Sequence, residues 1–389
     1  MTLAERIAER IRREGPITFA DFHAAALYDE HDGFFSSGRG AGRAGRDFVT
    51  SPEVGTLFGA LVGRFLDATW QRLGEPDPFV VIEAGAGRGR LAADVLRGEP
   101  ACAAALRYVL VERSPVLRAQ QRELLTLEPA DEALGPFTRR ADPDDVPEPV
   151  RNTGPIVTSI DDLPAIRVEG VVIANELLDN LPIRIVERAT DDWSEVRVGL
   201  DEDNGFVETL VTAPVALAGE ADAVTDGVTV ENGARVPVPM LARDWIERVG
   251  TMMGRGDLVV VDYAEEIAGL LARGSIGATG WLRTYREHGR GTAPLDAPGR
   301  QDVTVDLPLE YLRTSALRAG FAVAVDSTQA EWLRTLGIEA LVAEGDDTWR
   351  ERAHLGDLEA IAGRSRGVEA AALTDPDGLG AHRVLVLTR

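Results

Sequence analysis

The sequence is poor in the residues that bind metals or form cross-links. It has a single cysteine, Cys102, in 389 residues, and it contains no lysine. One cysteine cannot form an internal disulfide framework or a cysteine-based zinc site. The five histidines are scattered and predict no metal cluster. A single thiol in a chain of this length is typical of a reducing compartment.

Long apolar runs are missing as well. No run approaches the roughly 20 residues that a membrane span needs. The N-terminal residues 1–8 lack the apolar core of a secretory signal. We therefore expect a soluble, cytoplasmic protein without a membrane partner. The heavy use of Ala, Arg, Gly and Asp is typical of a high-GC bacterial genome.

Charge is strongly one-sided. The 41 basic residues face 64 acidic ones, which gives a formal net charge of −23. A chain of this charge repels phosphates unless it carries a local basic patch, so we expect no nucleic-acid partner. Hydrophobic residues make up 44% and charged residues 27%, which is ordinary for a globular protein and excludes a disordered or fibrous one.

Short apolar runs recur along the chain and alternate with stretches of helical periodicity. The runs cover residues 79–83, 106–111, 156–160, 171–174 and 258–261, and two more, 321–325 and 384–387, could add strands. Helical patterns occupy residues 91–96 and 116–127 between them. This alternation predicts an α/β fold with a parallel sheet covered by helices on both faces.

Three other regions depart from this rhythm. Residues 2–13 and 18–28 have the pattern of amphipathic helices, and residues 183–235 read as an inserted β-meander. Residues 264–300 are rich in Gly and Arg and predict a long loop or lid. We therefore divide the chain into an N-terminal helical segment with a lid (1–75), a core (76–182), the inserted meander (183–238) and the rest of the core (239–389).

The strongest chemical signal is the glycine-rich turn Gly85-Ala86-Gly87-Arg88-Gly89, which follows an apolar run and opens a helix. Glu83 lies two residues before the first glycine. A carboxylate there suits a cationic ligand and opposes a diphosphate, whereas the glycines allow a ligand to approach the backbone. S-adenosylmethionine has an ammonium, a sulfonium and no phosphate, so the turn favours this cofactor.

A second acid supports this interpretation. Glu112 ends the second apolar run, 25 residues after Gly87, where it could accept both ribose hydroxyls. Two alternatives remain. A dinucleotide site would have the spacing Gly-x-Gly-x-x-Gly, from which the third glycine departs by one residue. The turn could also be a tight strand-to-helix connection without a ligand.

A further constellation follows the fourth apolar run. Asn175 ends that run, and Glu176 and Asp179 are spaced three apart, so a helical turn would put both carboxylates on one side. Next to a sulfonium, such a pair could orient a guanidinium and withdraw its charge, so we predict Asn175, Glu176 and Asp179 as catalytic residues. The alternative is a helix N-terminus whose acids complement the dipole.

These motifs together resemble the MidA-like methyltransferases, a family that includes mitochondrial complex I assembly factors. The similarity spans most of the chain and includes residues 17–22, 45–59, 109–115, 174–182, 256–263 and 298–304. The block Asp47-Phe48-Val49-Thr50-Ser51-Pro52-Glu53 is its most specific part. The resemblance implies a Rossmann-like class I sheet that binds S-adenosylmethionine, and the mitochondrial members methylate a protein arginine.

The resemblance also assigns residues. It implies that Asp47 to Glu53 fold over the cofactor, although Thr50 and Glu53 could equally form a capping box at the start of a helix. The implied cofactor-binding residues are Glu83, Gly85, Gly87, Gly89, Glu112, Ser114, Asp161, Thr50 and Pro52. Glu53, Asp262 and Tyr263 are implied on the substrate side.

Three functions fit this sequence. The first is methyl transfer to a protein arginine by in-line displacement. The second is methyl transfer to a small-molecule acceptor on the same fold. The third is a non-catalytic assembly factor that keeps the S-adenosylmethionine-binding fold and binds a partner protein through the meander and the acidic surface. The presence of Glu83, Glu112, Asn175 and Glu176 favours an enzyme, because a scaffold without activity has no need of them. A homodimer is an option that the sequence does not decide.

Overall fold

The computed structural model of the chain describes residues 1–37, 50–135, 138–139, 148–149, 151–190, 192–273, 280–286 and 289–389. Contacts divide the chain into two compact units. The sheet unit comprises Thr50–Asn175, Thr251–Val261 and Ala322–Arg389, and the meander unit comprises Met1–Val49, Glu176–Gly250 and Asp262–Phe321. The lid residues Asp47, Phe48 and Val49 lie outside the described residues. The fourfold division made from the sequence stays a prediction.

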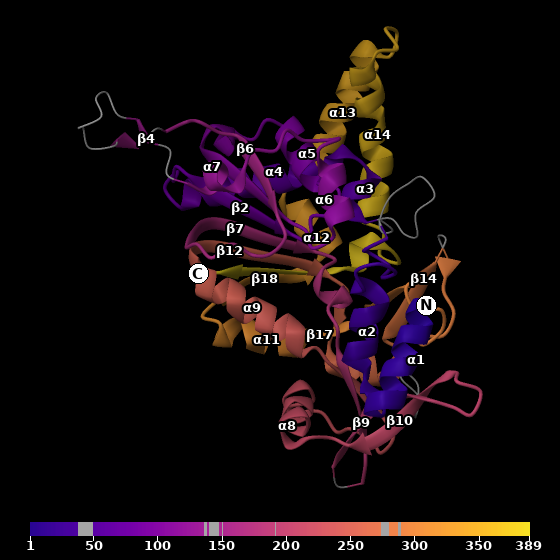
Figure 1. Cartoon of the computed structure of the whole chain (residues 1–389). Coiled ribbons are helices and arrows are strands. Elements are labelled where there is room, and N and C mark those ends of the chain that lie inside the picture. The colour runs from indigo at the N-terminus through magenta and orange to yellow at the C-terminus, as the bar shows by residue number, and fades with distance from the viewer. Residues whose placement is uncertain are drawn as a thin grey trace. The chain divides into compact units, whose positions relative to one another are not determined.

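Seven strands form the main sheet of the sheet unit, in the order β18-β19-β12-β7-β2-β3-β6 (Figure 1), and β4 Thr138–Arg139 pairs separately with β5 Glu148–Pro149. Their bounds are β2 Phe79–Ala84, β3 Leu106–Val111, β6 Ile156–Ile160, β7 Val168–Asn175, β12 Met253–Asp262, β18 Ala322–Thr328 and β19 Arg383–Thr388. The pairs β2–β3, β2–β7, β3–β6 and β7–β12 are parallel, whereas β18 and β19 are antiparallel. The predicted α/β, Rossmann-like sheet is confirmed.

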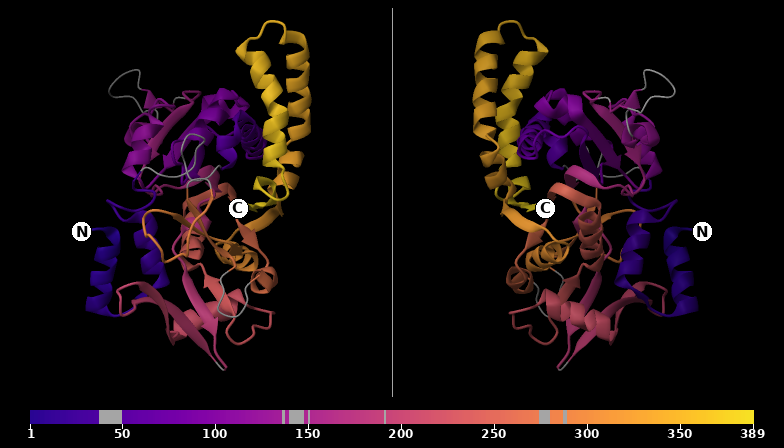
Figure 2. Two further views of the ribbon diagram at one scale, coloured as in Figure 1. Left: turned by 90° about the vertical axis from the view of Figure 1, so that its right-hand side faces the viewer. Right: turned by 90° about the vertical axis from the view of Figure 1, so that its left-hand side faces the viewer.

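The helices of the sheet unit connect and flank these strands. They are α3 Ser51–Val54, α4 Thr56–Arg72, α5 Arg90–Arg97, α6 Pro115–Gln121, α7 Ala130–Leu134, α12 Gln329–Thr335, α13 Ile338–Arg352 and α14 Leu358–Leu373. Helices α13 and α14 run side by side as a hairpin (Figure 2), and they meet at two glycines. A Cβ at Gly345 would lie 2.5 Å from the carbonyl oxygen of Gly363, so only glycine allows this approach.

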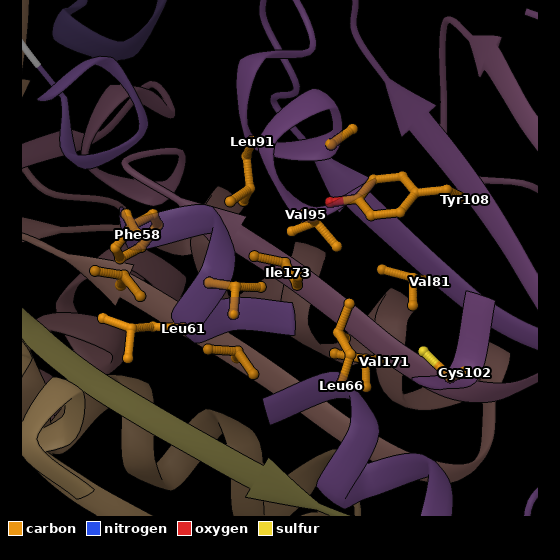
Figure 3. Close-up of a cluster of buried hydrophobic side chains, with 14 of the residues drawn as sticks. Phe58, Leu61, Leu66, Val81, Leu91, Val95, Cys102, Tyr108, Val171 and Ile173 are labelled. Atoms are coloured by element: carbon orange, nitrogen blue, oxygen red, sulfur yellow. The ribbon is translucent and has the colours of Figure 1, made fainter. Parts of the chain in front are cut away.

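The core of the sheet unit lies between the apolar faces of α4 and α5 and the central strands. Figure 3 shows Phe58 and Leu61 from α4, Val95 from α5 and Ile173 from β7 pointing into one cluster. The central strands read as continuous apolar runs because residues of both orientations are buried there. Cys102 is a buried member of this cluster, and burial raises the pKa of its thiol.

The meander unit is built on an antiparallel sheet. Strands β8 Arg184–Arg188, β9 Trp193–Leu200 and β10 Phe206–Thr212 form the predicted meander, and β1 Ile17–Thr18 and β11 Arg235–Val238 pair with β9 and β8. The helices are α1 Leu3–Glu14, α2 Phe19–Tyr28, α8 Val215–Val224, α10 Ile267–Arg273, α11 Leu309–Arg318 and most of α9 Met240–Met252. As predicted, α1 and α2 pack their apolar faces into the core.

The prediction of a long loop over residues 264–300 is wrong for its described part. Helix α10 lies within it, and β14 Leu282–Arg286 pairs with β15 Gly289–Arg290 and β16 Asp302–Val305. Two further short strands, β13 Ala264–Glu265 and β17 Leu307–Pro308, pair in parallel. The segment has few apolar residues, and four of them are buried in the core of the meander unit: Ile267, Leu270, Trp281 and Leu282.

Candidate functional site

The glycine-rich segment forms the strand–turn–helix connection that the sequence predicts. It leads from β2 to α5, and Gly85, Gly87 and Gly89 have φ angles of 72°, 51° and 76°. Residues with a side chain rarely adopt such φ angles, which explains why all three positions are glycine. A Cβ at Gly87 would meet nothing within 4 Å, so open space adjoins the backbone there. The turn can therefore admit a ligand against its backbone.

Glu112 follows β3 directly and contacts the glycine turn from this strand, which is the neighbour of β2. Its Oε2 accepts a hydrogen bond from the Gly87 amide at 2.9 Å, and its Oε1 accepts one from the Ser114 amide at 2.7 Å. Burial raises the pKa of the Glu112 carboxyl group, whereas the hydrogen bonds from these backbone amides lower it in part. Each carboxylate oxygen has a second lone pair, so Glu112 can still accept hydroxyls such as those of a ribose.

Glu83 lies beneath the turn. Its side chain is buried and accepts a hydrogen bond from the Tyr108 hydroxyl at 2.8 Å. Burial raises the pKa of Glu83 to about 8, which the Tyr108 hydrogen bond opposes. Glu83 is therefore mainly protonated at neutral pH. A cation next to it would favour the charged form, which fits the predicted approach of a cationic ligand.

The other predicted cofactor residues lie on neighbouring elements of the sheet unit. Thr50 and Pro52 belong to the start of α3, which contacts α5, the helix that follows the glycine turn. Ser114 is the N-cap of α6, and Asp161 is an exposed residue directly after β6. The expected capping box at Thr50 is wrong. The Thr50 side chain makes no cap, and the Glu53 amide donates to the Thr50 carbonyl instead.

A cluster of four acids lies in the meander unit. Asp262, at the end of β12, is buried, and its carboxylate organises the segment after β7. Its Oδ2 accepts from the amides of Leu177 at 3.2 Å and Leu178 at 2.8 Å, and its Oδ1 accepts from the Tyr263 amide at 2.9 Å. Asp262 was predicted on the substrate side. The structure shows that it also fixes the backbone that carries Glu176 and Asp179.

Asp179 is the most deeply buried of the predicted catalytic residues, with 2% of its surface exposed. Burial raises its pKa well above the usual value, and the charges of Asp262, Asp302 and Glu176 raise it further. The pKa of Asp262 is raised to about 7, again by burial. These carboxyl groups therefore crowd one another, and a cation among them would relieve the repulsion.

The local backbone does not support the dipole interpretation of these acids. The predicted helical turn is a 3-10 helix of three residues, Leu178–Asn180, which offers little macrodipole. Glu176 precedes it with a φ of 51°, a left-handed conformation that is uncommon for a residue with a side chain. Asn175 ends β7 opposite Val261 of β12. Strained backbone of this kind concentrates at functional sites.

Aromatic and amide groups adjoin the acid cluster. The Asn180 amide nitrogen donates to Asp302 Oδ1 at 3.3 Å, and the Tyr28 hydroxyl donates to the Asn180 carbonyl at 3.1 Å. The ring of Tyr263 lies 4.7 Å from the Arg283 guanidinium carbon. Burial raises the pKa of Tyr263, and the charges of Glu176 and Asp179 raise it further. Sequence reasoning missed Asn180, Asp302 and Arg283 as neighbours of the site.

Two classes of site have no support in the described part of the chain. No group of three or more His, Cys, Asp or Glu side chains there is arranged to hold a metal ion. Within the same residues, no helix combines the length and the apolar character that crossing a membrane requires.

Comparison with known proteins identifies what this geometry resembles. Residues 61–325 match a family described as "Putative S-adenosyl-L-methionine-dependent methyltransferase". The chain is 29% identical over 359 residues to the mitochondrial protein arginine methyltransferase NDUFAF7 of Danio rerio, covering 87% of this chain and 77% of that protein. It is 30% identical over 341 residues to the Mus musculus protein of the same name, with 85% and 73% covered.

A solved structure extends the likeness to the whole fold. A crystal structure from Burkholderia thailandensis that contains bound S-adenosyl-homocysteine superimposes with a TM-score of 0.79 and 25% sequence identity. The match covers 100% of this chain and 92% of that one. The bound product of the methyl donor and the matched family support S-adenosylmethionine as the cofactor of this chain.

Proposed function

Because the chain belongs to the S-adenosyl-L-methionine-dependent methyltransferase family that its residues 61–325 match, we propose that it methylates an arginine side chain of a protein. The relatives from Danio rerio and Mus musculus carry the name protein arginine methyltransferase, which supports this acceptor. The acid cluster of the meander unit supports it independently.

The observation that carries the proposal is the crowding of carboxyl groups around Asp179. Burial and three neighbouring acids, Glu176, Asp262 and Asp302, raise its pKa. Such a cluster binds a cation well, since the cation restores the ionised forms that crowding suppresses. A guanidinium stays charged at any physiological pH and presents a planar fork of donors to carboxylates. Arginine is therefore the protein side chain that these acids fit best.

The residues of the chain take separate roles in this proposal. The glycine turn and Glu112 bind the cofactor, which supplies an electrophilic methyl group on its sulfonium. Glu176 and Asp179 orient the guanidinium by accepting hydrogen bonds from it. When one guanidinium nitrogen bonds to the methyl carbon, the carbon–sulfur electron pair stays on the sulfur. That nitrogen then loses one proton, which an ionised carboxylate of the cluster accepts.

The proposal is tested by the chemical identity of the methylated product. We would incubate the protein with S-adenosylmethionine labelled in the methyl group and a lysate that supplies acceptors. Protein and small-molecule fractions are separated, and the protein is hydrolysed to amino acids. Label in methylarginine is the expected result. The Glu176→Gln variant serves as the inactive control.

Each other outcome names a different function. Label confined to the small-molecule fraction would replace the protein acceptor with a small one. Label in an amino acid other than methylarginine would keep the protein acceptor and reject arginine. Absence of label, together with normal binding of S-adenosylhomocysteine in a calorimeter, would indicate a non-catalytic binding protein.

A further inference from the structure

The junction between α3 and α4 depends on a close contact with the C-terminal helix α14. Gly55 is the N-cap of α4, and its φ of 170° is an extended conformation open to any residue. A Cβ at this position would, however, lie 2.1 Å from Cδ of Glu369. Gly55 is thus required by the Glu369 carboxyl group that occupies the adjoining space, and not by its own backbone angle.

Glu369 uses this space to cap α4. Glu369 lies on α14, and its side chain is buried. Its Oε2 accepts a hydrogen bond from the Leu57 amide at 2.9 Å. Its Oε1 accepts one from the Ser365 hydroxyl at 2.6 Å. Helix N-terminal amides need such an acceptor, and Gly55 has no side chain to supply it. A residue 312 positions away therefore caps this helix.

A second contact holds the other end of α3. The Ser51 hydroxyl donates to Gln329 Oε1 at 2.9 Å, and the Gln329 amide nitrogen donates to the Leu373 carbonyl at 3.0 Å. Leu373 and Glu369 are four residues apart, one turn of α14. The start of α4 is thus bonded directly to α14, and the start of α3 is connected through Gln329 to the same stretch of α14.

The position of α3 matters because α3 contacts α5, which begins directly after the glycine turn. Helices α4 and α5 are also tightly packed, since a Cβ at Gly59 would lie 2.5 Å from Asp94 Cβ. We propose that Glu369 is a positioning residue for the cofactor, which it does not touch. By capping α4 it holds Thr50 and Pro52 beside the glycine turn, so that α14 sets the affinity for S-adenosylmethionine.

The first test measures binding of S-adenosylhomocysteine by calorimetry, at a temperature where circular dichroism shows each variant folded. We expect Glu369→Ala to weaken binding about tenfold, the effect of one lost charge-assisted hydrogen bond. Glu369→Gln keeps an oxygen that can accept from Leu57 and should restore most of the affinity. The matched control is Glu359→Gln, an exposed acid on the same helix, which should bind normally.

The second test uses the close approach itself. Gly55→Ala should displace the carboxyl group and weaken binding in the same way as Glu369→Ala. The double variant should be no weaker than either single one, because the two changes remove the same contact. Additive losses would overturn the proposal. A folded Glu369→Ala with a lowered melting temperature but normal binding would also overturn it, since Glu369 would then be only structural.

One variant covers the case in which Glu369→Ala does not fold. Ser51→Ala removes the hydroxyl that donates to Gln329, and it should weaken binding about threefold, less than loss of the charged contact. Normal binding by both Ser51→Ala and Gly55→Ala would reject the proposal. The proposal concerns binding of the cofactor and not the identity of the methyl acceptor. The binding measurements therefore stay valid if the acceptor is not arginine.

Discussion

Glu112 in the sheet unit and Asp179 in the meander unit are both nearly buried carboxyl groups, but their surroundings differ. Glu112 accepts hydrogen bonds from the amides of Gly87 and Ser114. Asp179 faces the carboxyl groups of Asp262, Asp302 and Glu176, which raise its pKa. The first acid is stabilised by its own chain before any ligand binds. The second is destabilised until a cation arrives.

This difference teaches what each region is built to bind. Backbone donors around Glu112 keep it in place to accept further hydroxyls, which suits a neutral sugar. Carboxyl groups around Asp179 leave a local excess of negative charge, which suits a cationic acceptor. Burial raises the pKa of both acids, and for Asp179 three neighbouring carboxyl groups raise it further, so the acid cluster should respond more strongly to pH and to cations than Glu112.

The largest effect is expected for Glu176→Gln. The change removes one charge from the acid cluster and leaves the sheet unit untouched. We expect methyl transfer in a single turnover to fall by about 10²-fold, the usual cost of losing one electrostatic contact in a transition state. Binding of S-adenosylhomocysteine should not change. Glu202→Gln, an exposed acid in the same unit, is the control. Normal transfer would leave Asn175 as the candidate at the end of β7.

The next effect concerns Glu112→Ala, measured by calorimetry with S-adenosylhomocysteine. Removal of the acceptor for two hydroxyls should weaken binding by about 10²-fold, taking about 1.5 kcal/mol for each charge-assisted hydrogen bond, the lower end of the usual range. The melting temperature should fall too, because the amides of Gly87 and Ser114 lose their partner. The exposed Glu132→Gln, on α7 of the same unit, should change neither quantity. Unchanged affinity for Glu112→Ala would show that Glu112 serves only the turn.

Glu83 gives a smaller effect that depends on pH. Its pKa of about 8 lies above the usual value because of burial. If the ammonium of the cofactor binds the ionised form, the apparent affinity follows the ionised fraction. The dissociation constant should then fall about tenfold between pH 6 and pH 7, a range in which the amino group of the cofactor stays mainly protonated. Glu83→Gln should lose this dependence. A Glu83→Gln variant with the same pH profile as the wild type would assign the dependence to another group.

The comparison also shows what a sequence can predict. The strands β3 and β6 match the predicted residues 106–111 and 156–160. Strand β3 lies between β2 and β6 and is buried along its whole length, which leaves a mainly apolar run in the sequence. The glycine turn was predictable for a similar reason, since positive φ angles leave a mark in the local sequence. Both signals lie within one short segment.

Contacts between segments that lie far apart in the sequence have no such local sequence signal. Asn180 and Asp302 are 122 residues apart, and Glu369 and Leu57 are 312 apart. Nothing in either segment alone predicts that they meet. The expected capping box at Thr50 failed for the same reason, because the acceptor for the start of α4 comes from α14. Only the fold decides which of several suitable acceptors a helix uses.

The smallest predicted effect is a gain in stability, and it tests the crowding of acids directly. The folded-state pKa of Asp179 lies well above its usual value of 3.8, and that of Asp262 is about 7. Between the unfolded and folded pKa values the folded state binds more protons, so the free energy of unfolding falls as pH rises from about 4 through 7.

The Asp179→Asn side chain cannot ionise, so the variant should escape part of this loss of stability. At pH 8 its melting temperature should exceed that of the wild type by about 2 °C, which corresponds to about 1–2 kcal/mol in a chain of this size. The difference should shrink as the pH falls toward 3, because the wild-type carboxyl group then becomes mainly protonated in the unfolded state as well as in the folded state. Asp226→Asn, an exposed change in the same unit, should show no such trend. A variant that is less stable than the wild type at every pH would mean that the Asp179 side chain stabilises the fold by more than its crowding with the other acids destabilises it. The acid cluster would then no longer differ in kind from the acids of the glycine turn.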